Sequence, residues 1–424
     1  MKKRWLALML LGALALGCAV PALADETKQK EETVQTEHTP AGPDDRDDRK
    51  NYVPDEVGFI SFENIERRMR KENLKILMMG ENIDTLQEMD YEGIRTQLEM
   101  GLSMIDDQIF MLEQAAQMEP IGAQAAIASL RSQAAELEAQ LKEIKSGNLE
   151  EDNYGIIMQL ENTQEQLVMA GETTFIALKA METQEGALQR QLAALNRTVE
   201  EMELRYQMGQ ISALQLGEIK SGRSSLISGL STLRMNLKTY KAQLEQLLGA
   251  EITGEITLGA VPAVTQEQLD AMDEEADWEK CHRQSYDIYS AWTASVRADD
   301  KRDEVEKASG KDSYEYLAAR NSASAAEYTY EDTLQSCELK FRTLYAQVKD
   351  YQQIHETAKV SLACEQESYK AAQLRYEQGT ISENALLAAE DELRSAEEKV
   401  ENAANDLFSS YNTYCWAVQH GILN

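Results

Sequence analysis

The side chains best suited to chemistry are few and scattered along the chain. The 424 residues include five cysteines and four histidines. These are Cys18, Cys281, Cys337, Cys364 and Cys415, and His38, His282, His355 and His420. No two cysteines have the C-x-x-C spacing of a zinc or redox site, and the histidines do not cluster. A phosphate-binding glycine loop and a nucleophile with a nearby base are also missing from the pattern. The sequence therefore predicts a protein that is not an enzyme, with no cofactor and no metal site.

The strongly negative net charge argues against some classes of binding partner. The net charge is −32, with 74 acidic residues against 42 basic ones. Nucleic-acid binding depends on Lys and Arg side chains that neutralise phosphates, so a nucleic-acid partner is not expected. An anionic membrane surface is disfavoured for the same reason. The remaining readings are a well-solvated exported protein and a surface or conduit that favours cations.

The first 24 residues have the pattern of a secretory signal peptide. A basic start (Lys2 to Arg4) precedes an apolar run (Trp5 to Gly17) that is short for a membrane span. Ala22-Leu23-Ala24 then forms a small-x-small cleavage site. The alternative is cleavage before Cys18, at the end of "ALGC", with lipidation of that cysteine. Both readings predict export to the cell envelope, as a periplasmic, outer-membrane-associated or extracytoplasmic protein, and the second adds a lipid anchor.

Beyond the leader, composition divides the chain into a tether and two helical halves. Residues 25–54 are polar and charged and have too few apolar groups to fold, so we expect a disordered tether. The rest is rich in Ala, Leu, Glu, Gln and Lys, which favours long helices. We expect a first repeat over 55–249, a linker with at most one short strand over 250–263, and a second repeat over 264–421.

One nine-residue stretch is written twice in the sequence. "LRYQMGQIS" spans 204–212 and "LRYEQGTIS" spans 374–382, 170 residues later (374 minus 204), with six of nine positions identical. A glycine suits the left-handed position that ends a helix, an arginine in the last turn favours the helix dipole, and a serine caps the next helix. An isoleucine before that serine suits a hydrophobic staple. The residues are Arg205, Tyr206, Gly209, Ile211 and Ser212, and Arg375, Tyr376, Gly379, Ile381 and Ser382. Each stretch therefore predicts the tip of a helical hairpin, either as an efficient turn alone or also as a docking surface.

The helices that flank these tips share one heptad frame. Apolar residues recur in three- and four-residue steps from Leu216 to Leu247, and the same frame runs from Leu386 to Ala417. The predicted fold is all-α, with two internally repeated long antiparallel coiled-coil hairpins and at most one or two short strands. Near 118–152 the first repeat carries an insertion, which we interpret as an extra helix between Pro120 and Gly147.

Two helical hairpins with LRYxxGxIS tips behind a signal peptide resemble the TolC-type outer membrane efflux protein family. The resemblance covers residues from about 57 to 421 and is most specific at the two tips. It implies a homotrimer whose hairpins form a helical conduit in an export or efflux system. It also implies that the tips dock a periplasmic adaptor (membrane fusion) protein and, through it, an inner-membrane pump. On this resemblance, Gly209 and Gly379 contact the adaptor, and Tyr206 and Tyr376 lie near the entrance constriction.

The chain departs from the family where membrane strands are usual. A spanning strand needs about 9–11 residues with alternating apolar positions. The second half offers only "DEVEKASGKDSYEY" (303–316) at that place, and the first half has the helical insertion. We therefore expect a divergent member without a transmembrane β-barrel. The alternative function is a non-transporting coiled-coil spacer or interaction protein of the envelope.

A direct helix reversal at Gly310 has a consequence for two cysteines. In an antiparallel pair of helices that turns there, Cys281 and Cys337 lie at facing positions. The oxidising envelope makes a disulfide between them one prediction. The other is that they are two buried thiols that pack as small apolar side chains.

Overall fold

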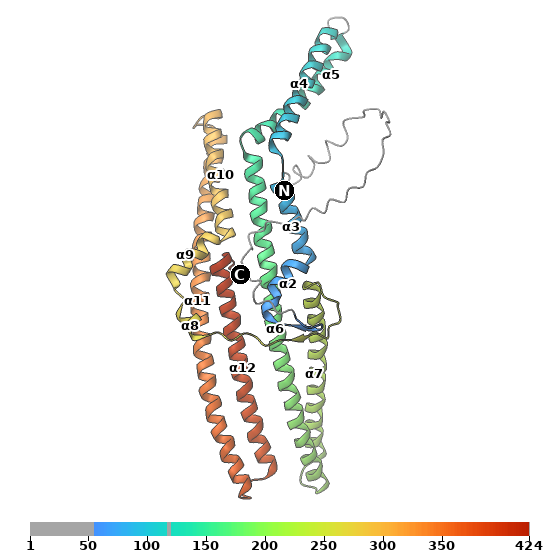
Figure 1. Ribbon diagram of the computed structural model, residues 1–424, viewed down its shortest axis with the longest axis vertical. Coiled ribbons are helices and arrows are strands. Elements are labelled where there is room, and N and C mark those ends of the chain that lie inside the picture. The colour runs from blue at the N-terminus through green and yellow to red at the C-terminus, as the bar shows by residue number, and fades with distance from the viewer. Residues whose placement is uncertain (1–54, 117–119, 424) are drawn as a thin grey trace, which may run out of the picture. The chain divides into compact units, whose positions relative to one another are not determined.

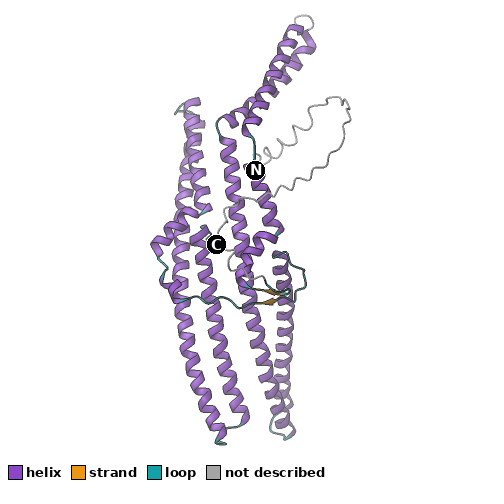
Figure 2. Ribbon diagram, in the orientation of Figure 1, coloured by secondary structure: helices purple, strands orange, loops and turns teal. Residues whose placement is uncertain are grey.

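The computed structural model describes residues 55–116 and 120–423 (Figure 1). The predicted signal peptide, the predicted tether and Cys18 lie outside these residues. Apart from two short strands, the described residues form helices and the turns that join them, as Figure 2 shows. The all-α prediction is confirmed.

The first repeat runs from the strand β1 to the helix α7. Its elements are β1 (Phe59–Ile60), the 3-10 helix η3 (Phe62–Asn64), α2 (Ile65–Glu72), α3 (Leu74–Gln87), α4 (Tyr91–Ala116), α5 (Pro120–Lys145), α6 (Asn148–Gln207) and α7 (Ala213–Leu247). The second repeat follows the linker strand β2 (Thr257–Leu258). Its helices are α8 (Gln266–Asp270), α9 (Glu274–Gln284), α10 (Tyr286–Ser309), α11 (Tyr314–Glu377) and α12 (Glu383–His420).

Two long hairpins dominate the fold. Helix α6 packs on α7, helix α11 packs on α12, and α12 also packs along α6. The heptad frame explains the pairing, because Leu230, Leu237 and Leu244 of α7 are buried, and Leu233 between them is partly buried against the first core. At the offset of 170 their counterparts in α12 are Val400, Leu407 and Tyr414, of which Leu407 and Tyr414 are also buried. Because α12 packs along α6 as well as on α11, the two repeats share one helical interface.

The first hydrophobic core lies where α2, α6 and α7 meet the end of α12. Phe175 of α6 is fully buried, and the ring of Phe62 contacts it edge-on at 5.7 Å between centroids. Phe62 also meets the ring of Phe408 from α12 at 4.9 Å. The short strands β1 and β2 pair in parallel beside this core, with Ile60 opposite Leu258. The linker thereby joins the first repeat at its start.

The second core lies between α9, α11 and α12. Phe341 of α11 is fully buried, and its ring centroid lies 5.7 Å from that of Trp278 and 5.6 Å from that of Tyr414. Cys281 and Cys337 belong to the same cluster. Both are free thiols, so the disulfide that the sequence suggested is not formed in this structure. Burial, together with the neighbouring Cys337, raises the pKa of the Cys281 thiol to about 12, which keeps it protonated and unreactive.

The two repeats differ most at the ends remote from their tips. In the second repeat α10 ends at Gly310, whose φ is +81°, and α11 begins at Tyr314 under a Ser313 cap. In the first repeat α3 is followed by α4 and α5, which pack on each other as a separate hairpin before α6 begins. The extra helix expected near Pro120 therefore has a partner, α4, that the sequence reading did not assign to it.

None of the helices in residues 55–116 and 120–423 combines the length and the apolar character needed to span a membrane.

Candidate functional site: the two hairpin tips

The first tip is a complete helix-terminating motif. Helix α6 ends at Gln207, and Gly209 takes a left-handed φ of +73°. The Gly209 amide donates to the carbonyl of Tyr206 at 2.9 Å, and the Gln210 amide donates to the carbonyl of Arg205 at 2.8 Å. These two bonds define a Schellman motif, which satisfies the last carbonyls of the helix.

The second tip reproduces these bonds. Gly379 has φ +69°, and its amide donates to the carbonyl of Tyr376 at 2.8 Å. The Thr380 amide donates to the carbonyl of Arg375 at 2.9 Å, and the Thr380 hydroxyl donates to the same oxygen at 2.8 Å. The repeated sequence therefore folds into the same turn twice.

Serine caps begin both returning helices. The Ser212 hydroxyl accepts from the amide of Gln215 at 3.2 Å, and the Gln215 side chain accepts from the Ser212 amide at 2.9 Å. This is a reciprocal capping box. Ser382 accepts from the Ala385 amide at 3.3 Å, but Ala385 has no side chain that reaches back. The second cap is therefore the simpler one.

Both glycines are required by backbone conformation and not by crowding. A Cβ atom built on Gly209 or Gly379 would meet nothing within 4 Å. Their left-handed φ is the reason for glycine, since an L side chain at such a φ is strained by about 1–2 kcal/mol. The turn therefore presents open backbone at the end of each hairpin, and a partner can approach it closely.

Apolar side chains stay uncovered beside these turns. Leu204 and Tyr206 are 56% and 45% exposed in the first repeat, and Leu374 and Tyr376 are 58% and 41% exposed in the second. The two tyrosines fall on the heptad seam, yet seam packing does not cover them in the single chain. Surface patches of this kind mark protein contacts in many proteins.

The charged groups near the first tip are paired locally. Arg205 pairs with Glu201 one turn earlier on α6. Lys220 of α7 reaches Glu203 of α6 at 2.7 Å and ties the two helices just behind the turn. The hydrogen bond from Lys220 lowers the pKa of the Glu203 carboxyl. Sequence reasoning did not single out this pair, although an acid before the turn and a lysine after it were a local signal for it.

Polar contacts join the two repeats along α6 and α12. Arg190 pairs with Glu398, and Arg197 pairs with Asp391. Near the other end of α12, buried Glu172 of α6 accepts hydrogen bonds from Asn412 Nδ2 and Trp416 Nε1, both at 2.7 Å. Burial raises the pKa of the Glu172 carboxyl, while these two bonds work against the rise. No sequence signal predicts this contact, because its members are more than two hundred residues apart.

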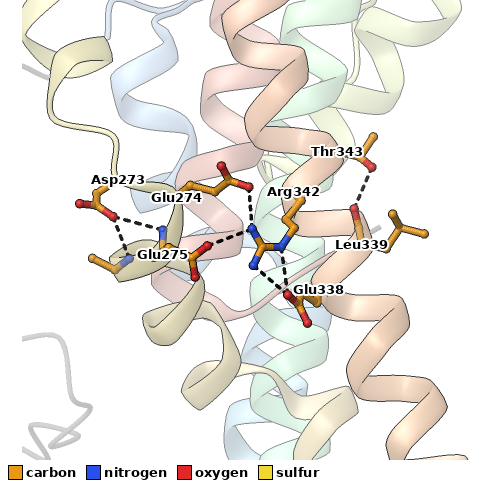
Figure 3. Close-up of polar contacts among 8 residues, drawn as sticks. Asp273, Glu274, Glu275, Glu338, Leu339, Arg342 and Thr343 are labelled. Carbon is orange, nitrogen blue, oxygen red and sulfur yellow. Dashed lines mark hydrogen bonds and ion pairs between the residues drawn. The ribbon is translucent and has the colours of Figure 1, made fainter.

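One arginine, surrounded by three glutamates, fixes the short helix α9 to the long helix α11 (Figure 3). Arg342 of α11 donates to Glu274 and to Glu275 at 3.0 Å and to Glu338 at 2.9 Å. Glu274 and Glu275 begin α9 under a cap from Asp273, whose carboxylate accepts from the Glu275 amide at 3.1 Å. Together the carboxylates raise the pKa of the Arg342 guanidinium. The contacts therefore fix the position of α9 on α11.

The fold of the chain is similar to that of solved membrane proteins. The Campylobacter jejuni CmeC outer membrane channel is 14% identical, with a TM-score of 0.51 and a match that covers 68% of each chain. A membrane protein from Pseudomonas aeruginosa is 13% identical, with a TM-score of 0.51, and the match covers 65% of this chain and 71% of that one. The chain therefore has a TolC-like fold. No protein-family model matches the sequence, and no curated protein matches it.

Proposed function

We propose that this protein is a TolC-like component of an export or efflux system in the cell envelope. In this proposal three copies assemble into a helical conduit through their α6–α7 and α11–α12 hairpins. The two tips of each copy dock a periplasmic adaptor protein, which connects the conduit to an inner-membrane pump. The chain itself conducts passively, and the pump supplies the energy.

The single observation that carries this proposal is the repeated tip. A Schellman turn is sufficient to end each helix, and exposed leucine and tyrosine side chains beside it are not part of that turn, yet both repeats have them. Two equivalent tips per chain give six in a trimer, which suits a partner that meets a ring of hairpins. The TolC-like fold supports the same reading.

A trimer also accounts for the free outer faces of the long hairpins. Helices α6 and α12 pack on each other inside one copy. Among the described residues α7 has one long neighbour, α6, whereas α11 packs on both α10 and α12 and keeps an exposed face beside them. Apolar side chains such as Met235 of α7 and Leu339 of α11 are 63% and 69% exposed. Contact between α7 of one copy and α11 of the next would cover such positions and close a ring.

The first experiment is the mass of the mature protein in solution, by light scattering at several concentrations. A trimer that persists on dilution is the expected result. A strict monomer at all concentrations would contradict the conduit, and would favour a non-transporting coiled-coil spacer or interaction protein instead.

The second experiment tests docking at the tips. Gly209→Pro with Gly379→Pro removes the amides that close both turns, and we expect loss of binding to a purified adaptor of the same organism. Gly209→Asn with Gly379→Asn is the matched control, since asparagine tolerates the left-handed conformation. Equal binding by both double variants would contradict docking at the tips.

A further inference from the structure

The hairpin formed by α4 and α5 has a defined register. Leu137 of α5 packs 3.6 Å from the position where Gly101 of α4 would carry a Cβ atom. Glu99 pairs with Lys145 at 2.8 Å, and Glu113 pairs with Arg131 at 2.7 Å, so the helices run antiparallel over their whole length. Residues early in α4 therefore lie beside residues late in α5 (Figure 1). Two residues share a level when they lie at the same height along the hairpin axis.

The edge of α4 that faces away from α5 is apolar and uncovered. Met100, Met104 and Met111 are 60%, 65% and 68% exposed. Their spacing of four and seven residues puts them on one stripe about 16 Å long, with Asp107 between the second and third. Nothing in residues 55–116 and 120–423 packs over this stripe. Several exposed methionines on one helix face are a typical protein-binding surface.

The edge of α5 that faces away from α4 has the complementary shape. The residues there are small and exposed, and they repeat with the same four- and three-residue steps. They are Ala128, Ser132, Ala135 and Ala139. The contact between Gly101 and Leu137 sets the register to within one residue, about 1.5 Å. Met100 then lies near the level of Ala139, Met104 near that of Ala135, Asp107 near that of Ser132 and Met111 near that of Ala128. Each large side chain thus has a small one at its own level, on the opposite edge of the same hairpin.

We propose that the methionine edge of α4 docks on the outer edge of α5 in a neighbouring copy of this chain. A rotation axis parallel to the hairpin keeps all levels aligned, so each methionine meets an alanine and the Ser132 hydroxyl donates to the Asp107 carboxylate. Large side chains against small ones allow close helix packing. The contact is head-to-tail and closes under threefold symmetry, so this inference rests on the proposed trimer. The hairpins then form a second ring of helices beyond that of the long hairpins.

Charge distinguishes this partner from two others. If α4 packed antiparallel on α4 of a second copy, the two Asp107 carboxylates near the middle of the stripes would face each other, and like charges repel. A lipid surface with anionic headgroups is disfavoured as well, because Asp106 and Asp107 adjoin the methionines. The edge of α5 offers Ser132 at that level instead, which is a hydrogen-bond donor.

Cysteine cross-linking of the full mature chain tests the contact. In a Cys364→Ser background, Met104→Cys with Ala135→Cys places two thiols on opposite edges of one hairpin, where they cannot react within a chain. On mild oxidation we expect cross-linked species up to the trimer on a non-reducing gel. Met100→Cys with Ala128→Cys is the matched control, with levels about 16 Å apart, and it should give at least tenfold less product.

Three outcomes would overturn the inference. One is a trimer by light scattering in which the Met104/Ala135 pair gives no product. Another is equal product from both pairs, and the third is dimer formation by Met104→Cys alone, which would indicate a face-to-face contact. A trimer in which the Met104/Ala135 pair gives no product would contradict the hairpin contact but not the proposed conduit. Specific cross-linking in a protein that binds no adaptor would support the hairpin contact and contradict the proposed docking at the tips. Circular dichroism of each variant confirms that the helices have formed.

Discussion

The two repeats of this chain end in the same tip but begin in different ways. Six identical residues in each tip produce the same two backbone hydrogen bonds and the same left-handed glycine. At the other end, the second repeat turns directly from α10 into α11 at Gly310, whereas the first inserts the α4–α5 hairpin. A tip depends only on residues a few positions apart, so the same short sequence produces the same turn in both repeats. The opposite end depends on which helices pack there, and there the two repeats differ.

The hydrophobic cores of the two repeats also differ, in the residues that fill equivalent positions. The offset that aligns the tips also aligns Gly171 with Phe341 and Glu172 with Arg342. Gly171 leaves room for Met69 of α2, whose Sδ atom would lie 3.2 Å from an added Cβ. Phe341 fills the corresponding place and packs on Trp278 of α9. At this equivalent position the core of the first repeat is filled by Met69 from the short helix α2. The core of the second repeat is filled by Phe341 from the long helix α11.

The largest effect is expected from Phe341→Ala. The side chain is fully buried among aromatic rings, so its removal should lower the free energy of unfolding by about 3–5 kcal/mol. Urea denaturation followed by circular dichroism measures the change. Tyr328→Ala on the same helix is the control, because that ring is 68% exposed. A loss as small as that of the control would mean that the second core is not packed as described.

The reverse exchange in the first repeat should also destabilise the protein. Gly171→Phe has no space beside Met69, and overpacking of this kind lowers the free energy of unfolding by about 1–3 kcal/mol. The combination Gly171→Phe with Met69→Ala should recover part of the loss. If the double variant were less stable than the sum of the single changes, the two positions would not compete for one space.

The tips should respond equally in both repeats. Gly209→Ala and Gly379→Ala should each lower the free energy of unfolding by about 1–2 kcal/mol, from backbone strain alone. The corresponding asparagine variants should lose clearly less, since asparagine adopts a left-handed φ more readily. Thermal unfolding of the four variants measures this. A large difference between the repeats would show that the two turns are not equivalent.

Glu172 should make the folding stability of the protein depend on pH. Burial raises the pKa of its carboxyl in the folded state above the value in the unfolded chain, so the folded state binds the proton more tightly. Its contribution to stability is therefore present below the unfolded pKa of about 4.3 and is lost as the pH rises through the folded pKa. The stability of the wild type minus that of Glu172→Gln should fall from pH 4 to pH 7. A flat difference would contradict the raised pKa.

The smallest effect is expected from Arg342→Gln. Its partners Glu274, Glu275 and Glu338 lie at the surface, where water and salt screen ion pairs, so the loss of stability should be close to zero. Arg70→Gln is the informative partner, because Arg70 meets Glu165 through two short bonds in a more buried place. We expect a larger loss at Arg70 by urea denaturation. Equal losses would mean that burial does not separate the two clusters.

The sequence by itself determined the parts of this protein that depend on near neighbours. Heptad spacing specified the long hairpins, and the glycine, serine and arginine of each tip specified the turns, because helix ends are closed by bonds within a few residues. The tertiary structure decided the rest. Which helix fills each core, how Glu172 meets Trp416 across the two repeats, and how α4 and α5 pair with their methionine and alanine edges outward all join residues with no local signal. Such contacts follow from the packing of whole helices against each other, and the local pattern of residues along the sequence does not specify that packing.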